Sequence, residues 1–409
     1  MKWAVLLGSP DISGGTYVIY EHMLRAMRNG VDVTIITESN VAKNQLNWHP
    51  EAASLRWTTF DLVRREQFDV ALATWWRTAY ELSRISARSY AYFVQSIESR
   101  FYDGESNAAL RLLVDGTYTL PLKVITEASW IAGHLRKYFG TEAHVVKNGI
   151  RKDIYTVNGP SHADRAHRRL RVLVEGPLNV AFKNVERTIA LCRRSMADEV
   201  WLLTSTRVNS IRGIDRVFSQ IPILDTPKVY RSCDVLVKLS YVEGMFGPPL
   251  EMFHCGGTAI VYDVTGHDEY IVGGHNSIVI RRDDETGVVE AINELRRSPN
   301  LLSQLKMGAV ATASEWPSWE WSAHKFRSAL NEIAQSEAVS AEELGAKGKL
   351  LFGFYELAEK YRAKNTEFSR TKYILKTARE KLRVRLPRIY SVLSGVKWWL
   401  KIRSKKRAV

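Results

Sequence analysis

Short apolar runs alternate with amphipathic stretches along most of the chain, and this alternation limits the possible folds more than any other feature. The first run, 2–7, ends in Gly8-Ser9-Pro10, and apolar residues at helical spacing follow until Gly30. Runs of this kind, separated by helices, indicate parallel strands in a sheet that is covered on both faces. Strands are expected at 2–7, 31–37, 70–74, 90–94, 123–126 and 144–146, and helices around 79–86 and 130–138.

The alternation starts again after a polar, His- and Arg-rich stretch at 161–169, which is typical of a linker. Strands are expected at 170–174, 200–204, 235–239, 259–262 and 277–280, with helices at 185–192, 249–254 and 285–295 and a Trp-rich amphipathic stretch at 316–334. The pattern predicts an α/β protein with two doubly wound, Rossmann-like domains, 1–160 and 161–335, and a helical basic extension at 336–409.

Composition supports this division. With 409 residues, 45% of them hydrophobic and 25% charged, the chain suits a globular protein of more than one domain. No run is long enough to cross a membrane. The three cysteines, Cys192, Cys233 and Cys255, are odd in number and widely spaced, which is typical of a reduced cytoplasmic protein without structural disulfide or zinc.

The net charge of +14 lies almost entirely in the last segment, because residues 371–409 hold thirteen Lys or Arg and one acidic residue, Glu380. Beyond Pro387, apolar residues recur near helical spacing beside Trp398 and Trp399. Aromatic and basic residues together favour a helix that lies on an anionic membrane surface. A solvated tail, or one that binds nucleic acid, is the alternative, and the aromatic content makes nucleic acid the weaker choice.

Two glutamates, Glu243 and Glu251, bracket a Gly-Met-Phe-Gly-Pro-Pro turn between an expected strand and an expected helix. Backbone N–H groups at such a turn favour anionic oxygens, and a proline suits the first helical turn. Glu251, on the helix, is placed to accept hydrogen bonds from sugar hydroxyls. A capped helix with a solvated glutamate is the structural alternative.

This segment resembles the E-x7-E signature of retaining GT-B-fold glycosyltransferases of glycosyltransferase family 4. The motif positions are filled by Ser240, Glu243, Gly244, Phe246, Gly247 and Glu251. The Gly-Met-Phe-Gly order shifts the usual Phe-Gly by one residue, although the spacing of the two carboxylates is kept. The resemblance implies a GT-B fold with two domains facing a cleft, with Glu251 on the donor ribose and Glu243 near the donor sugar. It also implies that Gly244, Met245, Phe246 and Gly247 contact the donor, and the form of 246–258 is similar to bacterial rhamnosyltransferase-like members that build surface polysaccharides such as lipopolysaccharide.

Gly14 and Gly15 lie at the mouth of the first expected strand, where backbone can approach a ligand closely. In the resembling family a Gly-Gly pair at this position lines the cleft, which assigns Gly14 to the donor and Gly15 to the reacting centre. An ordinary turn is the alternative.

Lys183 follows Glu175-Gly176-Pro177 and resembles the lysine of a Gly-Arg…Lys-Gly element that clamps the donor diphosphate in the family. Pro177 occupies the arginine position, so the clamp is incomplete. Because a diphosphate needs two positive partners or several N–H groups, Arg207 and Lys238 are the candidates for the second charge. A solvated lysine is the alternative for Lys183.

Gln95 and Glu98 follow an expected strand on the ligand side of the sheet and are candidates to face the acceptor or the donor sugar. Residues 126–130 and 147–150 also resemble family elements, with Ser129 as an expected helix cap. The histidines show no pairing typical of a divalent metal site, so none is predicted.

The sequence therefore predicts a retaining, metal-independent hexosyl transfer from a nucleoside-diphosphate sugar to a glycan or lipid-linked glycan, at the cytoplasmic face of a membrane. No cofactor is expected. A nucleotide-sugar epimerase or a phosphorylase on the same fold is the alternative among enzymes. A basic protein that docks on membrane or nucleic acid without catalysis is the alternative outside them.

Overall fold

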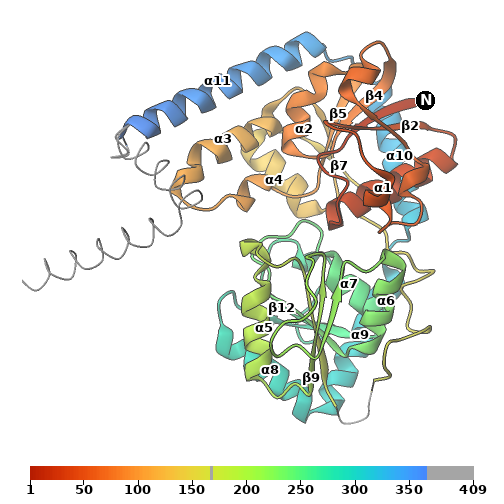
Figure 1. Ribbon diagram of the computed structural model, residues 1–409, viewed down its shortest axis with the longest axis vertical. Helices are drawn as coiled ribbons and strands as arrows, with labels where there is room; N and C mark the ends of the chain where they lie inside the picture. The colour runs from red at the N-terminus through yellow and green to blue at the C-terminus, as the bar shows by residue number, and fades with distance from the viewer. Residues whose placement is uncertain (166–168, 366–409) are drawn as a thin grey trace, which may run out of the picture. The chain divides into compact units, whose positions relative to one another are not determined.

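A computed structural model describes residues 1–165 and 169–365 of the chain. Residues 1–349 form one compact unit, and a second unit begins at Leu350. The first unit contains two parallel sheets with helices packed on them (Figure 1). We call the parts built on these sheets the N-terminal half and the C-terminal half.

The sheet of the N-terminal half has the strand order β3-β2-β1-β4-β5-β6-β7 among the described residues, and all its pairs are parallel. Its strands are β1 (Lys2–Leu6), β2 (Asp32–Thr37), β3 (Arg56–Thr59), β4 (Gln67–Ala73), β5 (Ser86–Val94), β6 (Lys123–Thr126) and β7 (Ala143–Val145). Its helices include α1 (Gly14–Arg28), α2 (Trp76–Glu81), α3 (Ala108–Gly116) and α4 (Ser129–Phe139). The strand order reverses between β1 and β4, which leaves a crevice at the carboxyl ends of these strands.

The sheet of the C-terminal half repeats this plan with the order β10-β9-β8-β11-β12-β13, again parallel throughout. Its strands are β8 (Arg171–Glu175), β9 (Glu199–Thr204), β10 (Arg216–Ser219), β11 (Val235–Lys238), β12 (Thr258–Tyr262) and β13 (Ser277–Ile280). Its helices are α5 (Val185–Arg194), α6 (Thr226–Ser232), α7 (Gly247–His254), α8 (Glu285–Arg297) and α9 (Pro299–Glu315). The predicted class, two doubly wound α/β domains, is therefore confirmed.

Helix α10 (Trp319–Gln335) follows the C-terminal half in sequence but belongs to the core of the N-terminal half. Trp319, Phe326, Leu330 and Ile333 form an apolar stripe at helical spacing, and this stripe is buried with residues of α1 and β5. An apolar stripe of this kind needs an apolar partner, and the C-terminal sheet is already covered by α5 to α9. The predicted domain 161–335 therefore loses its last helix to the N-terminal half.

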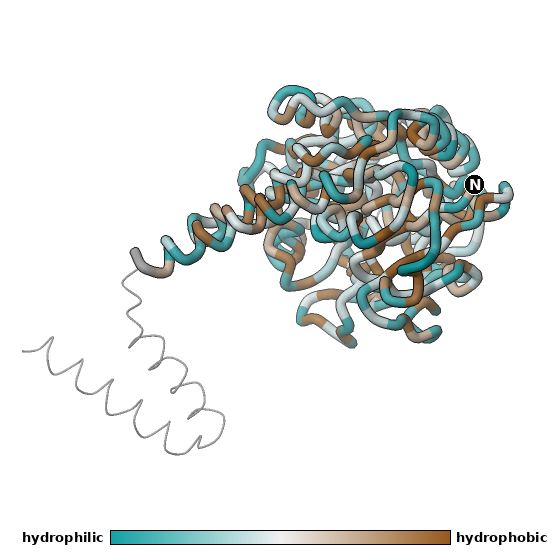
Figure 2. The backbone as a smooth tube through the Cα atoms, turned by 90° about the horizontal axis from the view of Figure 1, so that it is seen from above, coloured by the Kyte–Doolittle hydropathy of each residue, from teal (hydrophilic) through white to brown (hydrophobic). Residues whose placement is uncertain are grey.

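Helix α11 (Ala341–Asn365) begins in the first unit, where Leu344 is buried. Apolar and polar residues alternate along it (Figure 2), and Leu350, Phe354, Leu357 and Tyr361 are exposed. The basic segment 371–409, for which a membrane-bound helix is predicted, lies outside the described residues. None of the helices in the described ranges has the length and apolar character needed to cross a bilayer.

Candidate functional site

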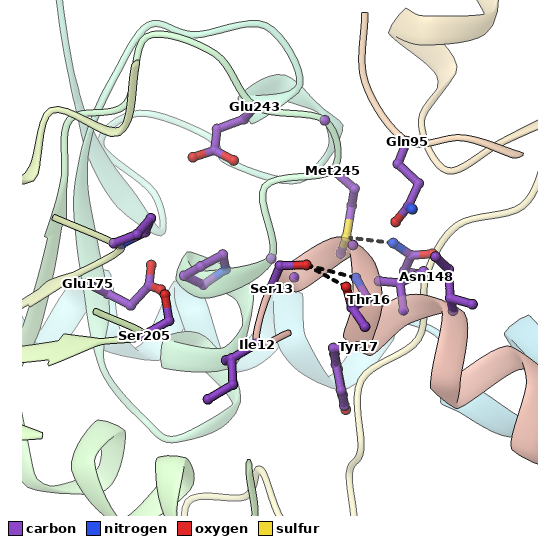
Figure 3. Close-up of a pocket in the computed structure, with 18 of the residues that line it drawn as sticks. Ile12, Ser13, Thr16, Tyr17, Gln95, Asn148, Glu175, Ser205, Glu243 and Met245 are labelled. Carbon is purple, nitrogen blue, oxygen red and sulfur yellow. Dashed lines mark hydrogen bonds between the residues drawn. The ribbon is translucent and has the colours of Figure 1, made fainter. Parts of the chain in front are cut away.

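A cavity of about 720 Å³ opens between the two halves, at the carboxyl ends of both sheets. The loops that follow parallel strands meet there, which explains why residues far apart in the sequence line one space. Many predicted residues are among the lining (Figure 3). These are Gly14, Gly15, Gln95 and Glu98 from the N-terminal half, and Lys183, Lys238, Glu243, Gly244, Met245, Gly247 and Glu251 from the C-terminal half.

Glu243 stands at the centre of a group of charges. Its Oε2 atom lies 2.8 Å from Lys183 Nζ, and its Oε1 atom lies 3.9 Å from Lys238 Nζ. Lys238, at the end of β11, is also 2.6 Å from Glu175 Oε2. Burial raises the pKa of Glu243, but the two ammonium groups outweigh this effect and hold it below its ordinary value. Glu243 is therefore an ionised carboxylate held between two lysines.

Lys238 places a second positive charge in the cavity. It is 3% exposed and lines the cavity, and although burial lowers its pKa, Glu175 and Glu243 raise it further, so the ammonium stays charged. Arg207, the other candidate, is exposed and does not line the cavity. Pro177 lines the cavity at the position where the resembling family has arginine. Of the two candidates for the second charge, only Lys238 therefore lies in the cavity with Lys183.

The 243–247 loop offers fewer free backbone amides than the sequence suggests. The Met245 N–H donates to Glu127 Oε1 (2.8 Å), and the Gly247 N–H donates to the Met245 carbonyl (2.9 Å). Pro248 and Pro249, in the first turn of α7, have no N–H group. The Phe246 side chain is fully buried in the core of the C-terminal half and does not line the cavity. An anionic ligand here would depend on the two lysines more than on a cradle of amides.

Glu251 lies on α7, half-buried and facing the cavity. The pKa of its carboxyl group is raised to about 7, mainly by burial and also by the neighbouring charge of Glu175. Hydrogen bonds from Tyr230 and Tyr155 act in the opposite direction and lower it. The two tyrosines come from α6 and from the segment before β8. Neither was singled out in the sequence, because no local pattern distinguishes a cavity tyrosine from a core tyrosine.

Gly14 and Gly15 open helix α1 at the mouth of β1, as expected. The Ser13 side chain caps this helix by accepting the Thr16 N–H (3.0 Å), a contact drawn in Figure 3. A side chain on Gly15 would meet the Gln95 amide at 3.3 Å, whereas one on Gly14 would meet nothing within 4 Å. Gly15 is thus the glycine that lets the helix lie close to Gln95.

Glu98 lines the cavity and also has partners within the N-terminal half, whereas Ser129 differs from its predicted role. Glu98 accepts the Trp76 N–H at the start of α2 (2.7 Å) and the Tyr92 hydroxyl (2.9 Å), and burial raises its pKa to about 8. Ser129 is the first residue of α4 and not its cap. Glu269, from the C-terminal half, accepts the Ser129 N–H (2.6 Å) and the Trp130 N–H (3.2 Å) in its place.

Two carboxylates near the cavity were missed as functional candidates. Glu127 lines the cavity, where burial raises its pKa to about 7, and Glu269, which is not part of the lining, joins the halves as described above. Glu127 lies within a stretch that resembles a family element, which was the one signal available. Within the described ranges, no group of three His, Cys, Asp or Glu side chains is arranged to hold a metal ion.

The two parallel-sheet α/β domains match the GT-B structures of glycosyltransferases. Anabaena HepE, solved in complex with UDP and glucose, superposes with a TM-score of 0.66 at 14% identity, over 81% of this chain and 100% of that one. Residues 216–310 match the model of the family described as glycosyl transferases group 1. The solved structures show the GT-B fold, and the family match, over about a quarter of the chain, makes its C-terminal half similar to group 1 glycosyl transferases.

Two curated proteins are similar to parts of this chain. The O-antigen biosynthesis protein RfbC of Myxococcus xanthus is 24% identical over 269 residues, which are 62% of this chain and 20% of that protein. A D-inositol 3-phosphate glycosyltransferase of Stackebrandtia nassauensis is 30% identical over 113 residues, 28% of this chain and 25% of that protein. The matches thus span about a fifth and a quarter of the two relatives.

Proposed function

We propose that this protein transfers a sugar, with retention and without a required metal, from a nucleoside-diphosphate sugar to a glycan or lipid-linked glycan. The observation that carries the proposal is the buried Glu243 carboxylate between Lys183 and Lys238, in a cavity shared by the two halves. A role in bacterial surface-polysaccharide synthesis is supported by the likeness to an O-antigen biosynthesis protein. From the form of residues 246–258 we further propose that the transferred sugar is rhamnose.

The C-terminal half would bind the donor. The diphosphate would lie against Lys183 and Lys238, because these ammonium groups line the cavity close to one another around Glu243. Glu251 would accept hydrogen bonds from the ribose hydroxyls. The UDP complex of HepE supports a nucleotide at this kind of site.

The chemistry follows from these charges. When the bond between the anomeric carbon and the phosphate oxygen lengthens, negative charge grows on the phosphate, and fixed ammonium groups stabilise it. The ionised Glu243 would stabilise positive charge on the sugar ring. Gly15 and Gln95 would bring the N-terminal half close to the reacting carbon, where the acceptor hydroxyl would attack the face from which the diphosphate leaves and pass its proton to the departing phosphate oxygen.

The direct test is incubation of the protein with labelled nucleotide sugars, with and without acceptor glycans, and with and without a chelator. We expect acceptor-dependent nucleotide release and a product with a retained anomeric configuration, unaffected by the chelator. Conversion of the donor without any acceptor would instead indicate the epimerase, and phosphate-dependent cleavage of a glycan would indicate the phosphorylase.

We also propose that the basic segment 371–409 docks the enzyme on the cytoplasmic face of an anionic membrane, where a lipid-linked acceptor would be presented. Each Lys or Arg near such a surface contributes about 1 kcal/mol. Replacing Trp398 and Trp399 with Ser should weaken binding to phosphatidylserine liposomes if the apolar face enters the interface. A tail that binds nucleic acid would show little response to this change and a steep dependence on salt.

A further inference from the structure

The backbone of the 243–247 loop is held by a carboxylate from the other half of the molecule. Glu127, between β6 and α4, accepts the Met245 N–H at Oε1 (2.8 Å) and the Asn148 side-chain amide at Oε2 (2.7 Å). Glu127 and Asn148 are 5% and 2% exposed. Both carboxylate oxygens are therefore engaged, one of them by the loop.

The same peptide group is also held at its carbonyl oxygen. The Trp130 indole N–H donates to the Gly244 carbonyl at 2.9 Å. A side chain on Gly244 would lie 1.9 Å from the Gln95 carbonyl oxygen and 2.7 Å from Glu127 Oε1. Glu127, Trp130 and Gln95 all belong to the N-terminal half, so this half contacts the loop from several directions.

Met245 is also the residue by which this loop departs from the common motif order. Its sulfur lies 3.7 Å from the Asn148 Nδ2 atom, and Figure 3 shows its side chain directed at Asn148. The extra residue before the Phe-Gly pair thus brings its own N–H group and side chain to two partners in the N-terminal half.

We propose that Glu127 is a positioning residue, which fixes the 243–247 loop, and through it Glu243, when the two halves close on the donor. The inference rests on the proposed function, because Glu243 is taken as the group beside the reacting sugar. Glu127 itself would not contact the donor phosphates: its two oxygens are occupied by protein donors, and the two lysines of the cavity come from the C-terminal half.

The test compares Glu127→Ala with Glu127→Gln in the full-length protein, and Glu142→Ala, an exposed residue that pairs with Arg136 on the surface, is the matched control. In Glu127→Ala the loop loses its acceptor, and a misplacement of about 1 Å lowers kcat about 100-fold. Affinity for UDP should change less than about threefold, because the lysines and Glu251 are untouched. Glu127→Gln keeps an oxygen for the Met245 N–H and should recover most of the rate, and Glu142→Ala should behave as the unaltered protein.

Hydrogen exchange of the 243–247 loop gives a readout that does not depend on transfer. We expect faster exchange at Met245 in Glu127→Ala, and near-normal exchange in Glu127→Gln. If Glu127→Ala does not fold, Trp130→Phe, which removes the donor to the Gly244 carbonyl and keeps an aromatic ring near Arg100, should lower kcat and leave UDP affinity unchanged.

The inference is overturned if a folded Glu127→Ala keeps its kcat, if it loses UDP affinity as strongly as rate, or if Glu127→Gln is as slow as Glu127→Ala. The proposed function would be overturned as well if the unsubstituted protein bound no nucleoside diphosphate and transferred no sugar. Normal transfer by that protein together with unchanged exchange in Glu127→Ala would overturn the inference alone.

Discussion

Glu251 is the residue whose proposed role can be measured most directly. Its carboxyl group faces the cavity from α7 beside Tyr155 and Tyr230. A charge-assisted hydrogen bond to ribose contributes about 1.5–3 kcal/mol, so Glu251→Ala should raise the Kd for the nucleoside diphosphate roughly 10- to 150-fold. Calorimetry measures this, and an unchanged Kd in a folded variant would remove Glu251 from the donor site.

The pKa of Glu251 adds a pH dependence to this binding. Burial raises the pKa to about 7, so the side chain gains a proton as the pH falls through neutrality, and the neutral acid is the weaker acceptor. Donor affinity should therefore fall from pH 8 to pH 6. Ionisation of the ligand phosphates also changes the affinity with pH, but it does so equally in the unaltered protein and in Glu251→Gln. The difference between the pH profiles of these two proteins therefore reports on Glu251 alone. Parallel pH profiles would contradict this assignment.

Lys238 should contribute both to the stability of the fold and to the affinity for the nucleoside diphosphate. Lys238→Met leaves the Glu175 and Glu243 carboxylates short of a partner, and breaking a buried ion pair costs about 3 kcal/mol. Both the melting temperature and the affinity for the nucleoside diphosphate should fall. Adding Glu175→Gln should restore much of the stability without the affinity. Arg207→Met, which removes an exposed charge outside the cavity, is the control, and equal loss of binding in that variant would contradict the assignment.

At the scale of elements, Gly244 is a point where the two halves meet closely. A methyl group there would overlap the Gln95 carbonyl oxygen, which is backbone and cannot rotate away. Gly244→Ala should therefore displace the 243–247 loop and lower kcat by one to two orders of magnitude, roughly the effect of a 1 Å shift. Gly133→Ala, in α4, meets nothing within 4 Å and serves as the control in the same kinetic assay. Full activity of Gly244→Ala would mean that the halves work further apart than in this structure.

The elements predicted correctly are those with strong local patterns. Every strand buried in the middle of a sheet is an apolar run, and each was found within a few residues. The edge strands β3 (Arg56–Thr59) and β10 (Arg216–Ser219) were missed because a half-exposed edge needs no apolar run. Helix α9 was missed because its small and polar residues give it a weak amphipathic pattern. Among site residues, Lys183, Glu243 and Glu251 belong to local motifs, whereas Glu127 and Glu269 meet partners 118 and 140 residues away, which no local pattern encodes.

At the scale of the whole molecule, the chain crosses between the halves twice, because α10 returns to the N-terminal half. Ser318 bridges Ile150 where the two crossings meet, and Trp319 then enters the N-terminal core. Helix α10 thus belongs to the core of the N-terminal half although it follows the C-terminal half in sequence. The N-terminal half is therefore incomplete without residues 319–335.

Truncation tests this arrangement. A chain that ends after Lys349 keeps the whole first unit and should fold and bind a nucleoside diphosphate, whereas liposome binding should be lost if the basic segment docks on membrane. A chain that ends after Glu315 lacks α10 and leaves the apolar partners of Trp319, Phe326 and Leu330 in water. Its N-terminal half should unfold, because each large side chain lost from a core costs about 2–5 kcal/mol, and three such losses together cost about as much as the usual stability of a whole domain. Circular dichroism and thermal melting of the two truncated proteins decide the matter, and a cooperative, undiminished melt of the shorter one would mean that α10 is dispensable to the N-terminal core.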